Sequence, residues 1–172
     1  GAGPRGTSAA DAIVCREASR DDLPRVWEML LGLAAYERLS PEVTGTREQL
    51  EHALFDPRPA IECLVAQRGE RLIGYALFFT TFSSFRTATG LWLEDLFVEP
   101  DARGAGAGRL LLAALATVAR ERGAIRVDWA VLDWNEPSIR FYEGVGARRV
   151  ASNWFQYRLD AEAMRRLIDD SV

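Results

Sequence analysis

The stretch that decides the fold reads L-E-D-L-F-V at Leu93–Val98 and, five residues later, R-G-A-G-A-G-R at Arg103–Arg109. An apolar strand pattern ends there, and a glycine-rich turn opens a helical pattern that continues to about residue 122. The free backbone N–H groups and the positive dipole end at such a helix start attract anions, especially phosphates. Glycines also let the backbone approach a ligand closely. The spacing predicts a pyrophosphate site, and a tight turn without a ligand is the alternative.

Working outward, apolar patterns predict strands that alternate with helices. The expected order is strand, helix, helix, three strands, helix, strand, helix, strand, helix. The predicted strands are residues 13–16, 61–67, 72–82, 91–98, 124–132 and 147–159. Consecutive strands favour antiparallel pairing, and the later strand–helix–strand crossover favours parallel pairing. We expect an α/β (α+β) fold, a mixed twisted sheet of about six or seven strands with helices on both faces. Residues 1–11 are predicted to be a flexible tail, and residues 12–172 a single domain.

Composition excludes several classes of protein. All 21 basic residues are arginine, so a Walker A loop and lysine Schiff-base chemistry are excluded. With His52 as the one histidine, a histidine-rich zinc site is excluded as well, and we expect no metal. The net charge of −4 argues against nucleic-acid binding, and no apolar run approaches the ~18 residues that cross a membrane. Cys15 and Cys63 lie in apolar strand patterns, which favours reduced thiols in a cytoplasmic protein.

Four stretches of sequence together resemble a known family. R-G-A-G-A-G at Arg103–Gly108 resembles the coenzyme A loop of the GNAT acyltransferase superfamily, whose pattern is Arg/Gln-x-x-Gly-x-Gly/Ala. L-W-L-E-D-L-F-V at Leu91–Val98, D-W-N-E-P-S-I-R-F-Y at Asp133–Tyr142 and A-Y-E at Ala35–Glu37 resemble its spermidine/spermine and thialysine acetyltransferase branch. The similarity runs over about residues 13–160. It implies the GNAT acyl-CoA N-acyltransferase fold, with acetyl-CoA as the donor.

The resemblance also implies which residues contact the cofactor. The pantetheine arm would pair with the strand backbone, the pyrophosphate would lie on the N–H groups of the glycine-rich turn, and two residues further along would also touch the cofactor. These residues are Leu96, Phe97, Val98, Arg103, Gly104, Ala105, Gly106, Ala107, Gly108, Arg109, Asn135 and Ser138. Asn135 is also a good helix N-cap, and capping is the alternative role for it.

Catalytic and acceptor residues follow from the same resemblance. Tyr142 matches the tyrosine that the family uses as a general acid for the departing thiolate. Glu94 matches a base that takes a proton from the acceptor ammonium, and it also binds that acceptor. Tyr36 and Glu37 would lie at the acceptor mouth. In a regular strand Glu94 and Asp95 point to opposite faces, so we expect Asp95 to make a salt bridge or a backbone hydrogen bond instead.

The predicted function is acetyl-CoA-dependent N-acetylation of a small primary amine (a polyamine, a diamine or a lysine-like amino acid) by direct attack in a ternary complex. Arg86 and the short, uncharged stretch Ser152–Trp154 depart from the polyamine branch and argue against long polyamines. A non-catalytic acyl-CoA sensor and an acetyltransferase of a peptide or protein amine are the alternatives. A homodimer is expected from the resemblance.

Overall fold

The computed structural model describes residues 12–150 and 153–171. By its internal contacts the chain divides into two compact units, residues 1–136 and 137–172. The described helices include none that is both long enough and apolar enough to cross a membrane.

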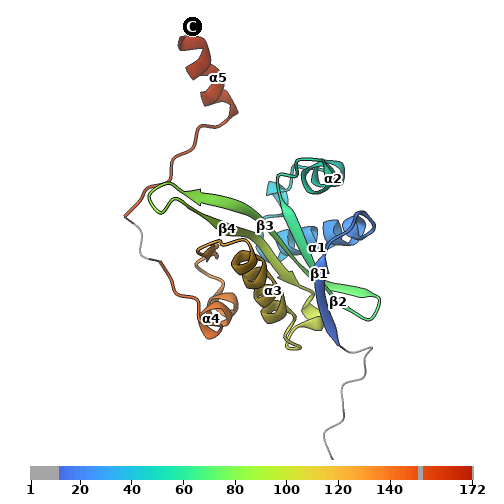
Figure 1. Ribbon diagram of the computed structural model, residues 1–172. Coiled ribbons are helices and arrows are strands. Elements are labelled where there is room, and N and C mark those ends of the chain that lie inside the picture. Colours follow the sequence, from blue (N-terminus) through green and yellow to red (C-terminus); the bar gives the residue numbers. More distant parts are fainter. Residues whose placement is uncertain (1–11, 151–152, 172) are drawn as a thin grey trace, which may run out of the picture. The chain divides into compact units, whose positions relative to one another are not determined.

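The first unit is built on one mixed sheet with the strand order β1-β2-β3-β4-β5 (Figure 1). Its strands are β1 (Ile13–Glu17), β2 (Glu62–Arg68), β3 (Arg71–Ser83), β4 (Ala88–Val98) and β5 (Val127–Asp128). The first four pair antiparallel and β5 pairs parallel with β4, as the element order predicted. The α/β class and the mixed sheet are therefore confirmed.

The expected strand count of six or seven was too high. The strand predicted at 124–132 shrinks to two residues, and the described part of 147–159 forms no strand. An alternating apolar pattern gives a segment one apolar face, but a strand also needs a neighbouring backbone to pair with. The described part of the second unit contains no such neighbour.

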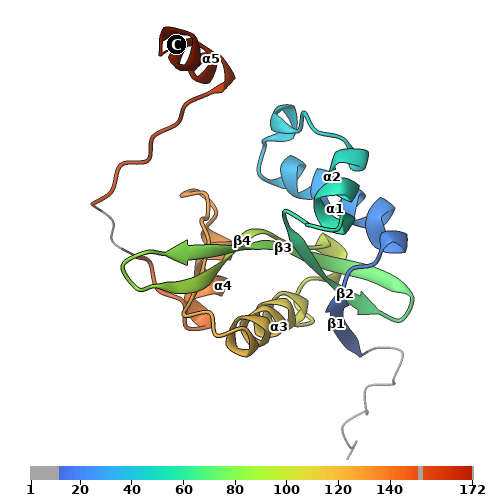
Figure 2. The same ribbon diagram turned by 45° about the horizontal axis from the view of Figure 1, so that its top comes forward.

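Helices cover both faces of the sheet, as Figure 2 shows with α3 on one side and α1 and α2 on the other. The described α-helices are α1 (Leu23–Tyr36), α2 (Arg47–Phe55), α3 (Ala107–Glu121), α4 (Glu136–Gly144) and α5 (Ala161–Asp170). Short 3-10 turns are η1 (Arg20–Asp22), η2 (Ser40–Glu42) and η3 (Pro100–Ala102). Thr46 and Gln49 form the capping box that the sequence indicated, with the Gln49 N–H 3.2 Å from Thr46 Oγ1.

Two separate apolar clusters hold this arrangement together. Leu111 and Leu115 of α3 are fully buried against one face of the sheet. On the other face Val26 and Met29 of α1 pack in a cluster that includes Tyr75 of β3. Each fully buried aliphatic side chain contributes about 1.5–3 kcal/mol, so both faces of the sheet are anchored.

A β-bulge interrupts β4 at Glu94. Leu77 of β3 lies opposite Asp95, but the next residue, Phe78, lies opposite Leu93, so Glu94 faces no residue of β3. An extra residue of this kind reverses the alternation of side chains beyond it. Before the bulge Leu91 and Leu93 point to the α3 side, and after it Leu96 and Val98 do.

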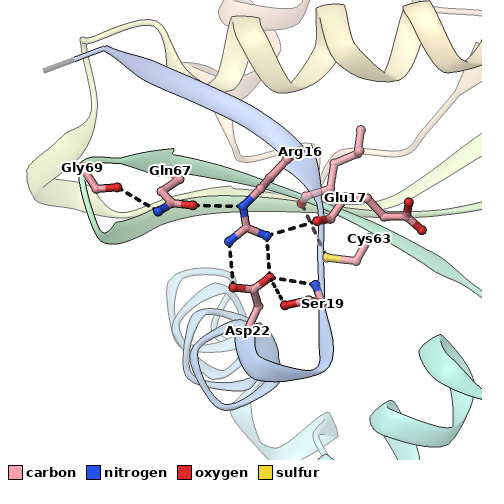
Figure 3. Close-up of polar contacts among 8 residues, drawn as sticks. Arg16, Glu17, Ser19, Asp22, Cys63, Gln67 and Gly69 are labelled. Carbon is pink, nitrogen blue, oxygen red and sulfur yellow. Dashed lines mark hydrogen bonds and ion pairs between the residues drawn. The ribbon is translucent and has the colours of Figure 1, made fainter. Parts of the chain in front are cut away.

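A polar network ties the end of β1 to η1 and β2 (Figure 3). The Arg16 guanidinium donates two hydrogen bonds to Asp22, at 2.7 and 2.9 Å, and a third to Gln67 at 2.9 Å. The backbone N–H of Ser19 donates to Asp22 as well, at 2.7 Å. These hydrogen bonds, led by those from Arg16, lower the pKa of Asp22 to about 2. Cys63 is a buried free thiol close by.

Candidate active site

The bulge places Glu94 and Asp95 on the same side of the sheet, so the expectation of opposite faces was wrong. Leu93 points to the α3 side, and Glu94 follows it on the α1 side, where Trp92 Nε1 donates to its carboxylate at 2.8 Å. Asp95 then accepts a hydrogen bond from Tyr75, which belongs to the α1-side cluster. A regular strand would have separated these carboxylates, whereas the bulge makes them neighbours.

Asp95 is the more enclosed of the two. The Tyr75 hydroxyl donates to Asp95 Oδ2 at 3.1 Å, and the Tyr75 ring is fully buried. Burial, together with the negative charges of Glu94 and Glu37, raises the pKa of Asp95 to about 6, although the Tyr75 hydrogen bond lowers it. The expected salt bridge or backbone hydrogen bond of Asp95 was therefore wrong. Its partner is the hydroxyl of Tyr75 on the neighbouring strand.

Glu37 completes a group of three carboxylates, which we call the acidic triad: Glu37, Glu94 and Asp95. Glu37 lies at the end of α1, and burial raises its pKa. It acts electrostatically on both Asp95 and Tyr75, so it lies near them. In residues 12–150 and 153–171, no arginine forms an ion pair with any member of the triad. A cationic ligand would relieve the repulsion within it.

The glycine-rich turn has the conformation that its glycines permit. Gly104 and Gly106 adopt φ values of +86° and +88°, and, apart from the adjoining residues of the chain, no atom lies within 4 Å of where a Cβ would stand on either residue. The first intrahelical bond of α3 runs from the Leu110 N–H to the Gly106 carbonyl at 3.0 Å. The N–H groups of residues 107–109 precede that bond, so the open turn fits the diphosphate of a coenzyme A molecule.

One edge of β4 is open beyond its middle. β5 pairs with β4 only at Leu91 and Trp92, so no strand of the described chain lies beside that edge at residues 93–98. Leu96, Phe97 and Val98 therefore present a strand edge that could take up the pantetheine amides, as the resemblance implied. Their other edge is paired with β3.

Tyr36 links the acceptor residues to the predicted cofactor residues. The Arg103 guanidinium lies 4.9 Å from the centre of the Tyr36 ring, and the Arg103 Nε–H donates to the Val98 carbonyl at 3.1 Å. The Tyr36 hydroxyl donates to Asn135 Oδ1 at 3.3 Å, and Asn135 is buried. The side chain of Arg103 thus braces the turn against β4 and Tyr36, while its neighbours supply the free N–H groups.

The second unit carries the two remaining predicted residues, Ser138 and Tyr142, one helical turn apart on α4. The Phe141 and Tyr142 rings are 5.5 Å apart at 50°. The Ala147 N–H donates to the Tyr142 carbonyl at 3.0 Å, which closes the helix at the Gly144–Gly146 turn. The roles of Ser138 and Tyr142 stay predictions.

Sequence reasoning missed Tyr75 and the recruitment of Asp95 to the triad. The motif L-E-D marked Asp95, but only the register between β3 and β4 shows where it points. Tyr75 is separated from it by 20 positions and lay inside an apolar run, where a core role was the natural interpretation.

Comparisons with known proteins agree with this geometry. The model of the acetyltransferase (GNAT) family matches residues 27–147. The chain is 34% identical over 166 residues to a thialysine N-epsilon-acetyltransferase of Sus scrofa, a match that covers 91% of this chain and 97% of the relative. It is 40% identical over 94 residues to an L-ornithine N5-acetyltransferase of Arabidopsis thaliana, covering 55% and 41% of the two chains.

A solved integron cassette protein from the mobile metagenome of V. cholerae shares the fold, with a TM-score of 0.72 and 21% identity over 91% of this chain and 97% of that one. The fold, the geometry of the glycine-rich turn and the sequence comparisons therefore all indicate the same family. The chain belongs to the acetyltransferase (GNAT) family, and it is an N-acetyltransferase that uses acetyl-CoA as its acetyl donor.

Proposed function

We propose that the acceptor is the terminal amine of a small cationic molecule, with a lysine-like amino acid favoured over a diamine or a polyamine. The acidic triad carries this proposal, because three neighbouring carboxylates have no arginine partner in the described chain. Two relatives named for thialysine and L-ornithine support it, since both names denote amino acids with a side-chain amine. Arg86, exposed in the β3–β4 turn, would favour an acceptor that bears a carboxylate.

In the proposed reaction Glu94, directly or through a water, takes one proton from the acceptor ammonium and passes it to solvent. The neutral amine nitrogen then forms a bond to the acetyl carbonyl carbon while the C–S bond of the thioester breaks. As the family resemblance implies, Tyr142 would donate its hydroxyl proton to the departing sulfur, and the second proton lost from the nitrogen would restore that hydroxyl. The products are an amide and the free thiol of coenzyme A.

Positioning would supply much of the rate. The backbone of Leu96–Val98 and the N–H groups of residues 104–109, with Asn135 and Ser138, would hold the donor. Tyr36 and the acidic triad would hold the acceptor. Tyr36 contacts both Arg103 and Asn135, which belong to the proposed donor site, so the donor and the acceptor would bind next to each other.

Thiol release from acetyl-CoA tests the proposal with an acceptor panel of lysine, thialysine, ornithine, diaminopropane, spermidine, a peptide amine and no acceptor. The chain contains no lysine, so self-acetylation of lysine side chains cannot add background. We expect saturable release with the amino acids. Saturable release only with the peptide would move the assignment to a protein acceptor, and release with none of the amines would contradict the proposal.

We also infer a single domain over residues 12–172, a homodimer and a cytoplasmic location. The family match crosses the boundary between the two units, which supports one domain. Phe155, Tyr157 and Leu159 are exposed, which supports a second copy that covers them. Both cysteines are free thiols, which supports a reducing compartment. Light scattering on the purified chain would give its oligomeric state directly.

A further inference from the structure

We propose that the buried hydroxyl of Tyr75 is a positioning group, which orients Asp95 and keeps it available to the acceptor cation. This inference rests on the proposed function, because it assigns Asp95 to the acceptor side of that site. Tyr75 would act only through Asp95.

The packing of the Tyr75 ring does not require its hydroxyl, but the hydrogen bond to Asp95 does. The Tyr75 ring is fully buried between β2 and β4, where it lies opposite Val65 and Phe97, and its centre is 6.2 Å from that of the Phe97 ring. Phenylalanine would fill this space without a polar atom to desolvate, so packing alone does not explain a tyrosine. The hydroxyl donates to Asp95 Oδ2 at 3.1 Å.

The hydrogen bond leaves the other carboxylate oxygen of Asp95 accessible. No fully buried side-chain oxygen or nitrogen in residues 12–150 and 153–171 lacks a hydrogen-bond partner. Asp95 is half-buried, the Tyr75 hydroxyl bonds to Oδ2, and no described residue forms a hydrogen bond to Oδ1, so Oδ1 retains some contact with solvent. A carboxylate fixed at one oxygen and open at the other is suited to receive an ammonium group in a defined direction.

The charges around Asp95 make this hydrogen bond important. Burial disfavours its ionised form most, and the charges of Glu94 on β4 and Glu37 at the end of α1 disfavour it further. From β2, Cys63 contributes a neutral thiol, because burial raises its pKa to about 12. Burial and the Asp95 charge raise the pKa of Tyr75 well above its ordinary value, so Tyr75 remains a donor throughout an assay range. Of these neighbours only Tyr75 favours the carboxylate.

The test compares wild type, Tyr75→Phe, Asp95→Asn and the double variant in kcat/KM against pH, with the amine that the acceptor panel identifies. We expect Tyr75→Phe to reduce kcat/KM about three- to ten-fold near pH 6–7, mainly through KM, and to approach wild type above pH 8.5. Taking the ratio of the two proteins cancels the titration of the amine itself. Tyr75→Phe should add nothing once Asp95→Asn is present.

A second readout does not depend on turnover. Carbon-13 NMR of the Asp95 carboxyl carbon should show a titration that moves to higher pH in Tyr75→Phe, with Asp95 about three- to ten-fold weaker as an acid. Val65→Ala, which loses packing opposite Tyr75, should lower stability without moving the titration. If no amine is acetylated, the proposed function fails while this readout still reports on Tyr75. An unmoved titration, or a ratio that is flat with pH, would overturn the inference.

Discussion

Asp22 and Asp95 are two largely enclosed carboxylates of the same unit, and both act electrostatically on the thiol of Cys63. Their environments are opposite. Asp22 receives two hydrogen bonds from Arg16, and its pKa falls to about 2. Asp95 receives one from Tyr75 beside two other acids, and its pKa rises to about 6. Arg16 supplies the counter-charge for Asp22, whereas no arginine of the described residues pairs with Asp95.

This difference separates a structural acid from one that is ready for a ligand. A paired carboxylate has already gained its electrostatic stabilisation on folding, whereas an unpaired one is costly until a cation arrives. The acidic triad therefore has the electrostatics of a recognition site, and the Arg16–Asp22 pair has those of a brace between β1 and η1.

The largest expected effect comes from Glu94→Gln, which removes the proposed base but keeps the shape of the triad. We expect kcat/KM for the amine to fall about 10²-fold near pH 7, because most of an alkyl amine is protonated there. The loss should shrink as pH rises toward the pKa of the amine. A pH profile of initial rates checks this, and equal losses at all pH values would mean that Glu94 does not act as the base.

Asp95→Asn should raise the stability of the protein and weaken its binding of the amine. The folded pKa of Asp95 lies above its unfolded value of about 4, so its contribution to stability is complete below about pH 4 and is lost as pH rises through about 6. Removing the charge should therefore stabilise the protein at pH 8 by about 1–2 kcal/mol, a rise in Tm of about 3–6 °C. The KM of the amine should rise about ten-fold at the same time.

Calorimetry and steady-state kinetics on the same Asp95→Asn sample give both numbers. If the variant were less stable at pH 8, the electrostatic cost of the triad would be smaller than the Tyr75 hydrogen bond. The contrast with Asp22 would then fail.

The sequence predicted features that depend on neighbouring residues, and it did not predict features that depend on distant ones. The Thr46–Gln49 capping box and the turn at Gly104 and Gly106 depend on neighbouring residues, and both were predictable. The bulge at Glu94 depends on the register between two strands, which no local pattern specifies. The strand expected at 147–159 had a suitable pattern but no pairing partner in the described chain. The acidic triad brings together residues from α1 and β4, so its members could be listed but not placed.

Asp22→Asn is expected to act in the opposite direction to Asp95→Asn. The folded pKa of Asp22 is about 2, below its unfolded value, so its contribution is complete above about pH 4 and is lost as pH falls through about 2. The variant should lose about 1–2 kcal/mol at pH 7, reduced from the full pKa difference because Arg16 is 37% exposed. Urea unfolding should show the difference at pH 7 and most of it gone at pH 2. The KM of the amine should not change.

Glu62→Gln is expected to have the smallest effect. It tests whether two-bond geometry or burial makes the Arg16–Asp22 ion pair strong. Arg122, at the end of α3, donates two hydrogen bonds to Glu62 of β2, at 2.7 and 2.6 Å. The pairing mode is the same, but the acid is 31% exposed, against 11% for Asp22. Water and salt screen a more exposed pair, so we expect a loss of only about 0.2–1 kcal/mol, which 0.5 M NaCl should reduce further. A loss as large as that of Asp22→Asn in the same urea experiment would show that the two-bond geometry, and not burial, determines the strength of these pairs.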